Sequence, residues 1–149
     1  MKDNTVLVSV AVVFKGKQKD PRWFVVKNGD EWELPKTIAR KGESSVRASI
    51  RMMAEQGGMV AKILEEIGRS GGAAKVDGKI ATQKILYYLM MFKSGEEILG
   101  FEDALWLNQT KALRKLTQKR DKEMLKDAKK LLKGLVIKKD PPPAEEEEE

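Results

Sequence analysis

The chain has 149 residues, the length of one domain, and no apolar run in it is long enough to span a bilayer. It has no cysteine and no histidine, which excludes disulfides, thiolate or imidazole metal sites, and triads with a histidine base. Any chemistry must therefore use carboxylates, amines, hydroxyls or a bound metal. The first residues lack the cleavage pattern of a signal peptide, so we expect a cytoplasmic protein with no membrane partner.

Charge is distributed unevenly along the chain. The net charge is +6, but residues 144–149 include five glutamates, and without these five charges the chain carries +11. A basic surface usually contacts the phosphates of nucleotides, nucleic acid or lipid headgroups, although many lysine-rich helix faces are simply solvated. The composition therefore favours a phosphate-bearing partner without choosing one.

Two strands are predicted near the N-terminus. Residues 6–14 form an apolar, mostly β-branched run, typical of a strand buried on both faces. Residues 22–26 form a second strand after a polar turn, and Asn28-Gly29 ends the predicted hairpin. Trp32 follows, and it is either a core or rim aromatic or a side chain that stacks on a base.

Residues 32–59 carry the most specific pattern in the chain. The segment begins Trp-Glu-Leu-Pro-Lys-Thr and continues with spaced polar, glycine and methionine residues: Glu43, Arg51, Met53, Glu55, Gly58 and Met59. This spacing resembles the Nudix box, a loop-helix-loop that binds divalent metal and a diphosphate. The family consensus is Gly, five residues, Glu, seven residues, Arg-Glu, an aliphatic, any residue, Glu-Glu, any residue, Gly and an aliphatic.

Aligned from Thr37, the box needs no gap, but three of its positions differ. Thr37 replaces the opening glycine, Met52 replaces the glutamate after the arginine, and Gln56 replaces the second of the paired glutamates. By resemblance, the paired glutamates supply most of the metal ligands, and the base is often the glutamate that Met52 replaces. A thioether does not bind a hard cation and an amide brings no charge, so we expect weak or absent Mg²⁺ binding.

The resemblance also implies roles for individual residues. The catalytic candidates are Glu43, Arg51 and Glu55. The metal-binding candidates are Glu55, Gln56 and Glu102. The substrate-binding candidates are Lys36, Trp32 and Arg120. Family members often have an acidic residue after the central strand that supplements the metal site, and the candidates here are Glu96, Glu97, Glu102 and Asp103, which are otherwise solvated loop acids.

Ser44 is predicted to cap a box helix that ends near Gln56. Its buried stripe is predicted from the helical period as Val46, Ile50, Met53 and Gly57. Met52 is then expected at the edge of this stripe, where a glutamate would reach the metal without being fully buried. On this basis, restoring glutamates at positions 52 and 56 together is expected to raise hydrolysis.

Further strands are predicted at residues 60–69, 79–92 and 101–107, of which 79–92 is the longest apolar run and the central strand. Its adjacent tyrosines, Tyr87 and Tyr88, must face opposite sides of the sheet, one in the core and the other available to a pocket.

Two helices are predicted after these strands. Asn108 opens a short helix, and residues 117–135 form an amphipathic helix that is expected to reach Ile137, with lysines outside its apolar stripe. Some relatives have a tyrosine that stacks on adenine where this chain has Gln118, which argues against diadenosine-polyphosphate specificity. Residues 141–143 are prolines, and the acidic tail beyond them is expected to be disordered and able to fold back on the lysines.

We therefore predict an α/β protein with the Nudix fold, an α/β/α sandwich with a mixed curved sheet between the box helix and the C-terminal helix. Residues 1–139 are predicted to form one domain, and residues 140–149 a tail. Function depends on the site, and three hypotheses remain open. The first is binding of a nucleotide or other diphosphate with weak or no hydrolysis. The second is an active Mg²⁺-dependent pyrophosphohydrolase, and the third is a nucleic-acid or protein-binding module that uses the region Lys111–Lys139.

Overall fold

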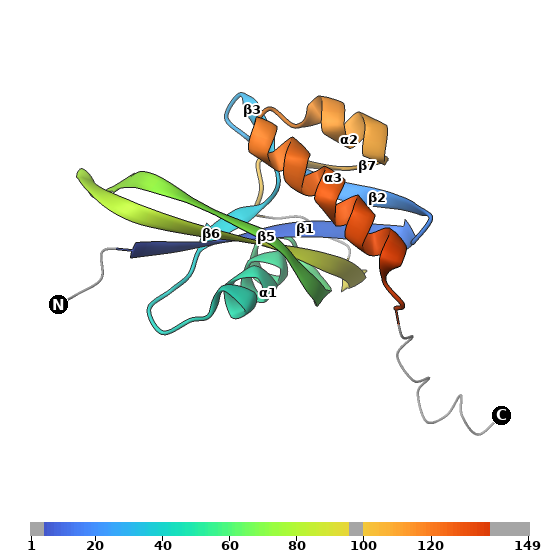
Figure 1. Ribbon diagram of the computed structural model, residues 1–149, viewed down its shortest axis with the longest axis horizontal. Helices are drawn as coiled ribbons and strands as arrows, with labels where there is room; N and C mark the ends of the chain where they lie inside the picture. The colour runs from blue at the N-terminus through green and yellow to red at the C-terminus, as the bar shows by residue number, and fades with distance from the viewer. Residues whose placement is uncertain (1–4, 96–99, 138–149) are drawn as a thin grey trace, which may run out of the picture.

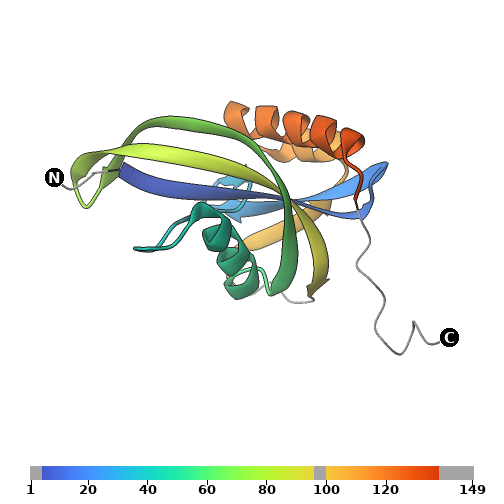
Figure 2. The ribbon, with the colours of Figure 1, turned by 60° about the horizontal axis from the view of Figure 1, so that its bottom comes forward.

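A computed structural model describes residues 5–95 and 100–137 of the chain. Seven strands form one curved sheet that has a helix on one face and two helices on the other (Figures 1 and 2). The elements in chain order are β1 (Thr5–Lys17), β2 (Asp20–Asn28), β3 (Glu31–Glu33), β4 (Lys36–Ile38), α1 (Ser45–Glu55), β5 (Met59–Val76), β6 (Lys79–Gly95), β7 (Asp103–Leu107), α2 (Gln109–Lys115) and α3 (Lys119–Gly134). This architecture confirms the predicted sandwich.

The sheet is mixed because its two central strands run parallel. Its main path is β3-β2-β1-β6-β5, and β1 pairs with β6 in parallel from Thr5 opposite Thr82 to Phe14 opposite Met91. The other edge of β1 is shared by β4 and β2, both antiparallel to it. The strand predicted at 79–92 is therefore central, as expected, and β5 and β6 are longer than the sequence indicated.

Each face of the sheet has its own core. The face under α3 holds Val10, Phe14, Trp23 and Tyr87, whereas the face under α1 holds Phe24 and Tyr88 together with other buried side chains. The two adjacent tyrosines thus lie on opposite faces, which confirms the prediction from strand geometry. Within the described residues, no helix combines the length and the apolar character needed to cross a membrane.

Helix α1 begins as predicted, but it turns a different face to the sheet. The Ser44 side chain accepts a hydrogen bond from the backbone N–H of Arg47, which is an N-cap. The predicted stripe is wrong in its first half, because Val46 and Ile50 are 37% and 43% exposed, whereas Met53 and Gly57 are buried as expected. The buried residues of α1 are Ser45, Ala48, Ser49, Met52 and Met53.

Hydroxyl groups explain why α1 buries serines. Ser9 Oγ on β1 donates to the carbonyl oxygen of Ser45 at 2.7 Å and lies 2.6 Å from Ser49 Oγ. Ser45 Oγ in turn lies 2.5 Å from the Tyr88 hydroxyl on β6. Because each buried hydroxyl has a partner, the polar residues can face the sheet at little cost.

Helix α3 packs much as the sequence predicted. Its buried apolar residues are Met124, Leu125, Ala128 and Leu132, with Leu131 and Leu135 partly buried. The helix ends at Gly134 and does not reach Ile137. Gln18, between β1 and β2, donates from its side-chain amide to the carbonyl oxygens of Leu132 and Leu135, which satisfies the helix end.

Candidate functional site

The three predicted catalytic residues form one ion-pair cluster that runs from the loop before the box helix to its last turn. Arg51 Nε and Nη2 donate to Glu43 Oε2 and Oε1 at 2.8 and 2.9 Å, a two-point contact. Arg51 Nη1 lies 3.8 Å from Glu55 Oε1, and Arg40 Nη2 lies 3.3 Å from the same oxygen. The cluster therefore ties the loop before α1 to the last turn of α1.

The chemistry of this cluster is that of a structural clamp. The hydrogen bond from Arg51, with a second from the backbone N–H of Arg40, lowers the pKa of Glu43 to about 2. A carboxylate with so low a pKa stays ionised and is a weak proton acceptor, which makes it a poor general base near neutral pH. Glu55 is 53% exposed and is held by the two arginines.

A polar cavity of about 230 Å³ lies beside the end of α1. Its lining residues are Val26, Lys27, Asn28, Glu33, Lys36, Gln56, Gly100, Phe101 and Glu102. Gln56 and Glu102, two of the predicted metal ligands, thus lie together, and Lys36, a predicted substrate contact, lies with them. Glu55, the third predicted ligand, does not line this cavity.

Close contact between two backbone segments shapes one wall of the polar cavity. Gln56 follows the last residue of α1, and its carbonyl oxygen accepts a hydrogen bond from the backbone N–H of Gly100 at 2.9 Å. A Cβ added to Gly100 would lie 2.8 Å from the Cα of Gln56, so a larger residue does not fit there. The glycine therefore lets the segment before β7 approach the box helix.

Each carboxylate in the polar cavity is paired with a lysine. Lys36 Nζ lies 3.7 Å from Glu33 Oε1, and Lys27 Nζ lies 3.8 Å from Glu102 Oε2. Glu33 is 8% exposed and also accepts a hydrogen bond from the Asn28 side chain. The Lys27 side chain is 38% exposed and the Lys36 side chain is 49% exposed, so both lysines remain accessible to an anion.

These residues fit a divalent metal poorly without a phosphate ligand. Mg²⁺ prefers octahedral coordination by oxygen atoms, and the side-chain oxygens here come from two lysine-paired carboxylates and the neutral amides of Asn28 and Gln56. Over residues 5–95 and 100–137, no group of three acidic side chains is placed to hold a metal ion. We therefore derive no reaction step through a metal.

Met52 and Thr37 occupy positions that the sequence did not predict. Met52 is 0% exposed within the core under α1, so it does not lie at the edge of a stripe and cannot be exchanged for a metal-binding glutamate without burying a charge. Thr37 lies in β4, opposite Ser9 on β1, in ordinary extended backbone. Met52 is thus part of the core, and Thr37 is part of the sheet.

A second cavity, of about 440 Å³, lies on the α3 face of the sheet, and we call it the sheet cavity. Its lining residues are Val8, Val10, Leu34, Lys36, Thr37, Ile38, Gln83, Ile85, Tyr87, Gln118 and Asp121. Five of these residues are aliphatic, namely Val8, Val10, Leu34, Ile38 and Ile85, and Asp121 from the first turn of α3 supplies a polar end. Lys36 lines both cavities, so they adjoin.

Asp121 is the buried acid of the sheet cavity. It is 8% exposed, and its Oδ2 accepts a hydrogen bond from the backbone N–H of Leu34 at 3.2 Å. Burial raises its pKa to about 6, further raised by Glu33 and Glu31 and opposed by the Leu34 hydrogen bond and by Lys36. The carboxyl group can therefore accept or donate a hydrogen bond near neutral pH.

The other two predicted substrate residues do not line either cavity. Trp32 is half-buried against the core under α3, its backbone exchanges hydrogen bonds with Thr117, and Lys115 Nζ lies 4.6 Å from its ring centroid. This favours the structural role over base stacking. Arg120 is exposed on the first turn of α3, beside Asp121.

The remaining acidic candidates are not brought into the site. Asp103 is exposed and its Oδ1 accepts a hydrogen bond from the backbone N–H of Ala104. Glu96 and Glu97 lie outside the described residues. Sequence reasoning missed Lys27, Glu33 and Asp121, and only Glu33 had a signal, since it lies next to Trp32 in the segment that leads into the box.

Comparisons with known proteins agree on the fold. The chain is similar to an Ap4A hydrolase of C. elegans solved as a binary complex, with 16% identity over 87% of this chain and 99% of that chain at a TM-score of 0.68. It is also similar to the NUDIX domain of Shewanella oneidensis NrtR complexed with ADP ribose, with 18% identity over 89% and 90% at a TM-score of 0.65. A NUDIX hydrolase from Nitrosomonas europaea aligns with 16% identity over 83% and 87% at a TM-score of 0.66.

Sequence comparison gives weaker but consistent results. No protein-family model matches the chain. A protein described as putative mutator protein MutT4 of Mycobacterium tuberculosis is 32% identical over 79 residues, which are 51% of this chain and 32% of that protein. The match thus spans about a third of the relative's length. Together with the structural similarities, it confirms that this chain has the fold of the Nudix hydrolases.

Proposed function

We propose that the protein binds a nucleoside diphosphate derivative and hydrolyses it slowly or not at all. The observation that carries the proposal is the position of Lys36, which lines both the polar cavity and the sheet cavity. A ligand could place its diphosphate in the polar cavity and its base or ribose in the sheet cavity. The link between its two parts would then lie beside Lys36. The neighbours solved with ADP ribose or named for Ap4A hydrolysis support this class of ligand.

The polar cavity suits a diphosphate because its ammonium groups are accessible. Lys27 and Lys36 each face a single carboxylate at 3.8 and 3.7 Å, distances longer than a direct charge-assisted hydrogen bond. Phosphate oxygens can replace or bridge these contacts. The sheet cavity suits an aromatic base, since aliphatic walls bury its faces and Asp121 offers a hydrogen-bonding group to its edge.

Slow hydrolysis follows from the box helix. The position of the usual base is Met52, which is buried, and Gln56 lines the polar cavity without a charge. Glu43 and Glu55 are engaged by arginines. Loss of a positioned general base costs about 10²–10⁴ in rate, and fewer metal-binding charges reduce the stabilisation of phosphoryl transfer further.

One observation favours the second candidate, an active Mg²⁺-dependent pyrophosphohydrolase. Glu33, Gln56 and Glu102 line the same cavity, so a bound diphosphate could complete an oxygen ligand set that these side chains begin. In that case nucleotide binding would require Mg²⁺, and water would attack one phosphorus of the diphosphate, break the bridging P–O bond and leave two phosphate products, one of them a nucleoside monophosphate.

Calorimetry and a hydrolysis screen test the proposal together. ADP-ribose, nucleoside triphosphates and dinucleoside polyphosphates would be titrated with and without Mg²⁺, and the same compounds incubated with Mg²⁺ or Mn²⁺. We expect Mg²⁺-independent binding to at least one of these compounds. Lys36→Gln should weaken this binding about 10–100-fold. Lys79→Gln, at the start of β6, should leave it unchanged. Rapid turnover would establish the second candidate, and no binding to any of these compounds would overturn both.

A further inference from the structure

The C-terminal half of α3 has a concentration of lysines that the nucleotide cavities do not use. Two surface hollows, of about 460 and 590 Å³, adjoin there and share Lys129 and Lys133. The first also contains Lys126 from α3, and the second contains Lys17 and Lys19 from the β1–β2 turn. We call these five lysines the lysine groove.

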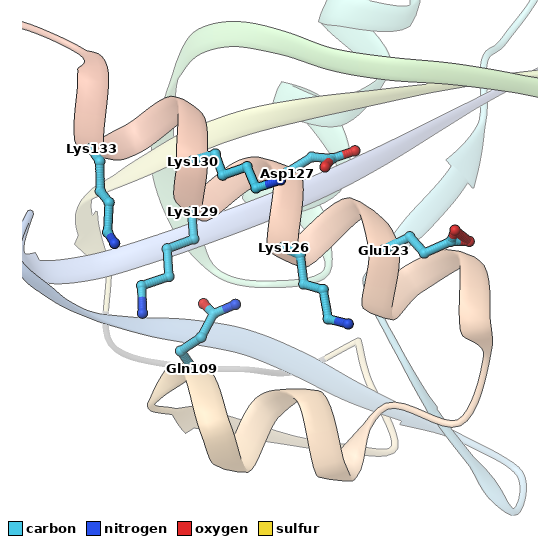
Figure 3. Close-up of a pocket in the computed structure, with 7 residues that line it drawn as sticks. All are labelled: Gln109, Glu123, Lys126, Asp127, Lys129, Lys130 and Lys133. Atoms are coloured by element: carbon cyan, nitrogen blue, oxygen red, sulfur yellow. The ribbon is translucent and has the colours of Figure 1, made fainter.

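The lysines of the groove are arranged along one side of the helix. Lys126, Lys129 and Lys133 extend toward the side of α3 that faces Gln109 at the start of α2, whereas Lys130 and Asp127, which also line the first hollow, extend from another side of the helix (Figure 3). Lys126 and Lys133 are seven residues apart, about 10 Å along the helix axis. One nucleic-acid strand has a phosphate about every 3.4 Å of its axis, so the three lysines match about three phosphates.

The five lysines have no charged partner among the residues that the structure describes. None of the five lysines forms an ion pair with a described carboxylate, and of the acidic residues only Glu123 and Asp127 line the hollows. At the end of α3, the carbonyl oxygens of Leu132 and Leu135 already accept hydrogen bonds from the Gln18 side chain. Unpaired like charges this close repel one another, and a polyanion would relieve that repulsion.

The groove differs from a membrane-binding surface and from a base-reading surface. Helices that bind lipid insert an apolar face, but the apolar face of α3 is buried against the sheet through Leu125, Ala128 and Leu132. No aromatic side chain lines either hollow, so stacking on bases is excluded there. What remains is recognition of a chain of phosphates.

We propose that the lysine groove binds the phosphate backbone of a nucleic acid without sequence preference. This goes beyond the nucleotide site, because no groove residue lines the polar cavity or the sheet cavity. A strand would lie along α3, with Lys126, Lys129 and Lys133 on one side and Lys17 and Lys19 at its end. Binding of this kind releases counterions and is steeply weakened by salt.

Fluorescence anisotropy of labelled single-stranded RNA and of a DNA duplex, measured across a series of salt concentrations, tests the proposal with the full chain. We expect both to bind, with the logarithm of the affinity falling linearly with the logarithm of the salt concentration. The double variant Lys129→Gln/Lys133→Gln should lower the magnitude of that slope by about 1.4–1.8, since each phosphate contact contributes roughly 0.7–0.9. The matched variant Lys75→Gln/Lys79→Gln removes two lysines from the adjoining ends of β5 and β6 and should change the slope little.

Three outcomes would overturn the proposal: no nucleic-acid binding at low salt, equal losses in the two double variants, or binding that depends on the groove but occurs only with vesicles containing phosphatidylserine. The last would make the groove a lipid-headgroup site. Binding of ADP-ribose in the groove variant should match that of the unaltered chain, so failure of the nucleotide proposal and failure of this one remain distinguishable.

Discussion

Helices α1 and α3 cover opposite faces of the same sheet with different chemistry (Figure 2). Helix α3 buries an aliphatic stripe that includes Leu125 and Leu132, and its lysines face solvent. Helix α1 buries two serines and two methionines, and leaves Val46 and Ile50 exposed. A helix can thus pack on a sheet through hydrogen-bonded hydroxyls as well as methionines, and only some of its apolar residues then lie in the interface.

The largest expected effect comes from placing a charge in the α1 interface. Met52→Glu puts a carboxylate at a position that is 0% exposed. We expect a loss of about 4 kcal/mol or more in the free energy of unfolding, measured with urea, because a buried unpaired charge is among the most destabilising changes. We also expect the double change Met52→Glu/Gln56→Glu to bring no gain in hydrolysis, contrary to the expectation from the box pattern.

Gln56→Glu is the matched control for that change, because its side chain lines the polar cavity rather than the core. Its effect on stability should be about 1 kcal/mol or less. If Met52→Glu were as stable as the unaltered chain and hydrolysed diphosphates in the presence of Mg²⁺, α1 would have to turn residue 52 toward the cavity.

The next effect concerns Asp121, the buried acid on the α3 side. Its pKa of about 6 lies above the value of about 3.9 for an unfolded aspartate, so the folded chain holds the proton more tightly. This contribution to stability is complete below about pH 4 and is lost as the pH rises through about 6. Relative to the unaltered chain, Asp121→Asn should gain roughly 2–3 kcal/mol in free energy of unfolding between about pH 4 and pH 7.5.

Urea denaturation of both proteins at the two pH values measures this gain. The charges of Glu31, Glu33 and Lys36 influence the pKa of Asp121, but these residues are present in both proteins. Glu43, whose pKa is lowered in the folded chain, is also present in both. The difference between the proteins therefore isolates Asp121. A difference that stays constant with pH would show that Asp121 titrates alike in the folded and unfolded chains.

A smaller pair of changes tests the comparison directly. Ser9→Ala removes the partner of the Ser45 carbonyl and the Ser49 hydroxyl, and should cost roughly 1–3 kcal/mol because buried polar groups lose hydrogen bonds. Ala128→Ser adds a hydroxyl to the aliphatic face of α3 and should cost a similar roughly 1–3 kcal/mol. Thermal or urea unfolding that left either variant unaffected would contradict the distinction between the two interfaces.

The smallest effect is expected from the acidic tail, residues 144–149, which lies outside the described residues. If its five glutamates compete for the lysines of α3, a chain ending at Asp140 should bind anionic ligands more tightly at low salt. The gain should vanish near 1 M salt, where the Debye length is about 3 Å. Equal affinity of the two chains at low salt would show that tail and helix do not interact.

The fold could be predicted because its signals are local and repeated. The apolar runs of β1 and β6, the cap at Ser44 and the aliphatic period of α3 each indicate one element, and the box spacing indicates their order. The face of α1 could not be predicted, because the serines it buries become acceptable only through partners on β1 and β6 that are distant in sequence.

The candidate site was predicted in part for a similar reason. The box spacing correctly joined Glu43 to Arg51, since both lie on a single loop and helix. The polar cavity instead combines residues from β2, β3, β4, the end of α1 and the segment before β7. Their spacing along the chain does not predict that Lys27 lies opposite Glu102. Asp121 resembled an ordinary acid in the first turn of a helix until its burial was known.

The parallel pairing of β1 with β6 has a consequence for folding kinetics. Strands β1 and β2, like β5 and β6, are joined by short turns and can form as local hairpins, but Thr5 meets Thr82 only after most of the chain has been synthesised. Ribosomal synthesis therefore releases the apolar strand β1 before its central partner β6 exists. During that interval the edge of β1 that later pairs with β6 has no partner strand. Molecular chaperones that bind extended apolar segments would bind β1 at this stage.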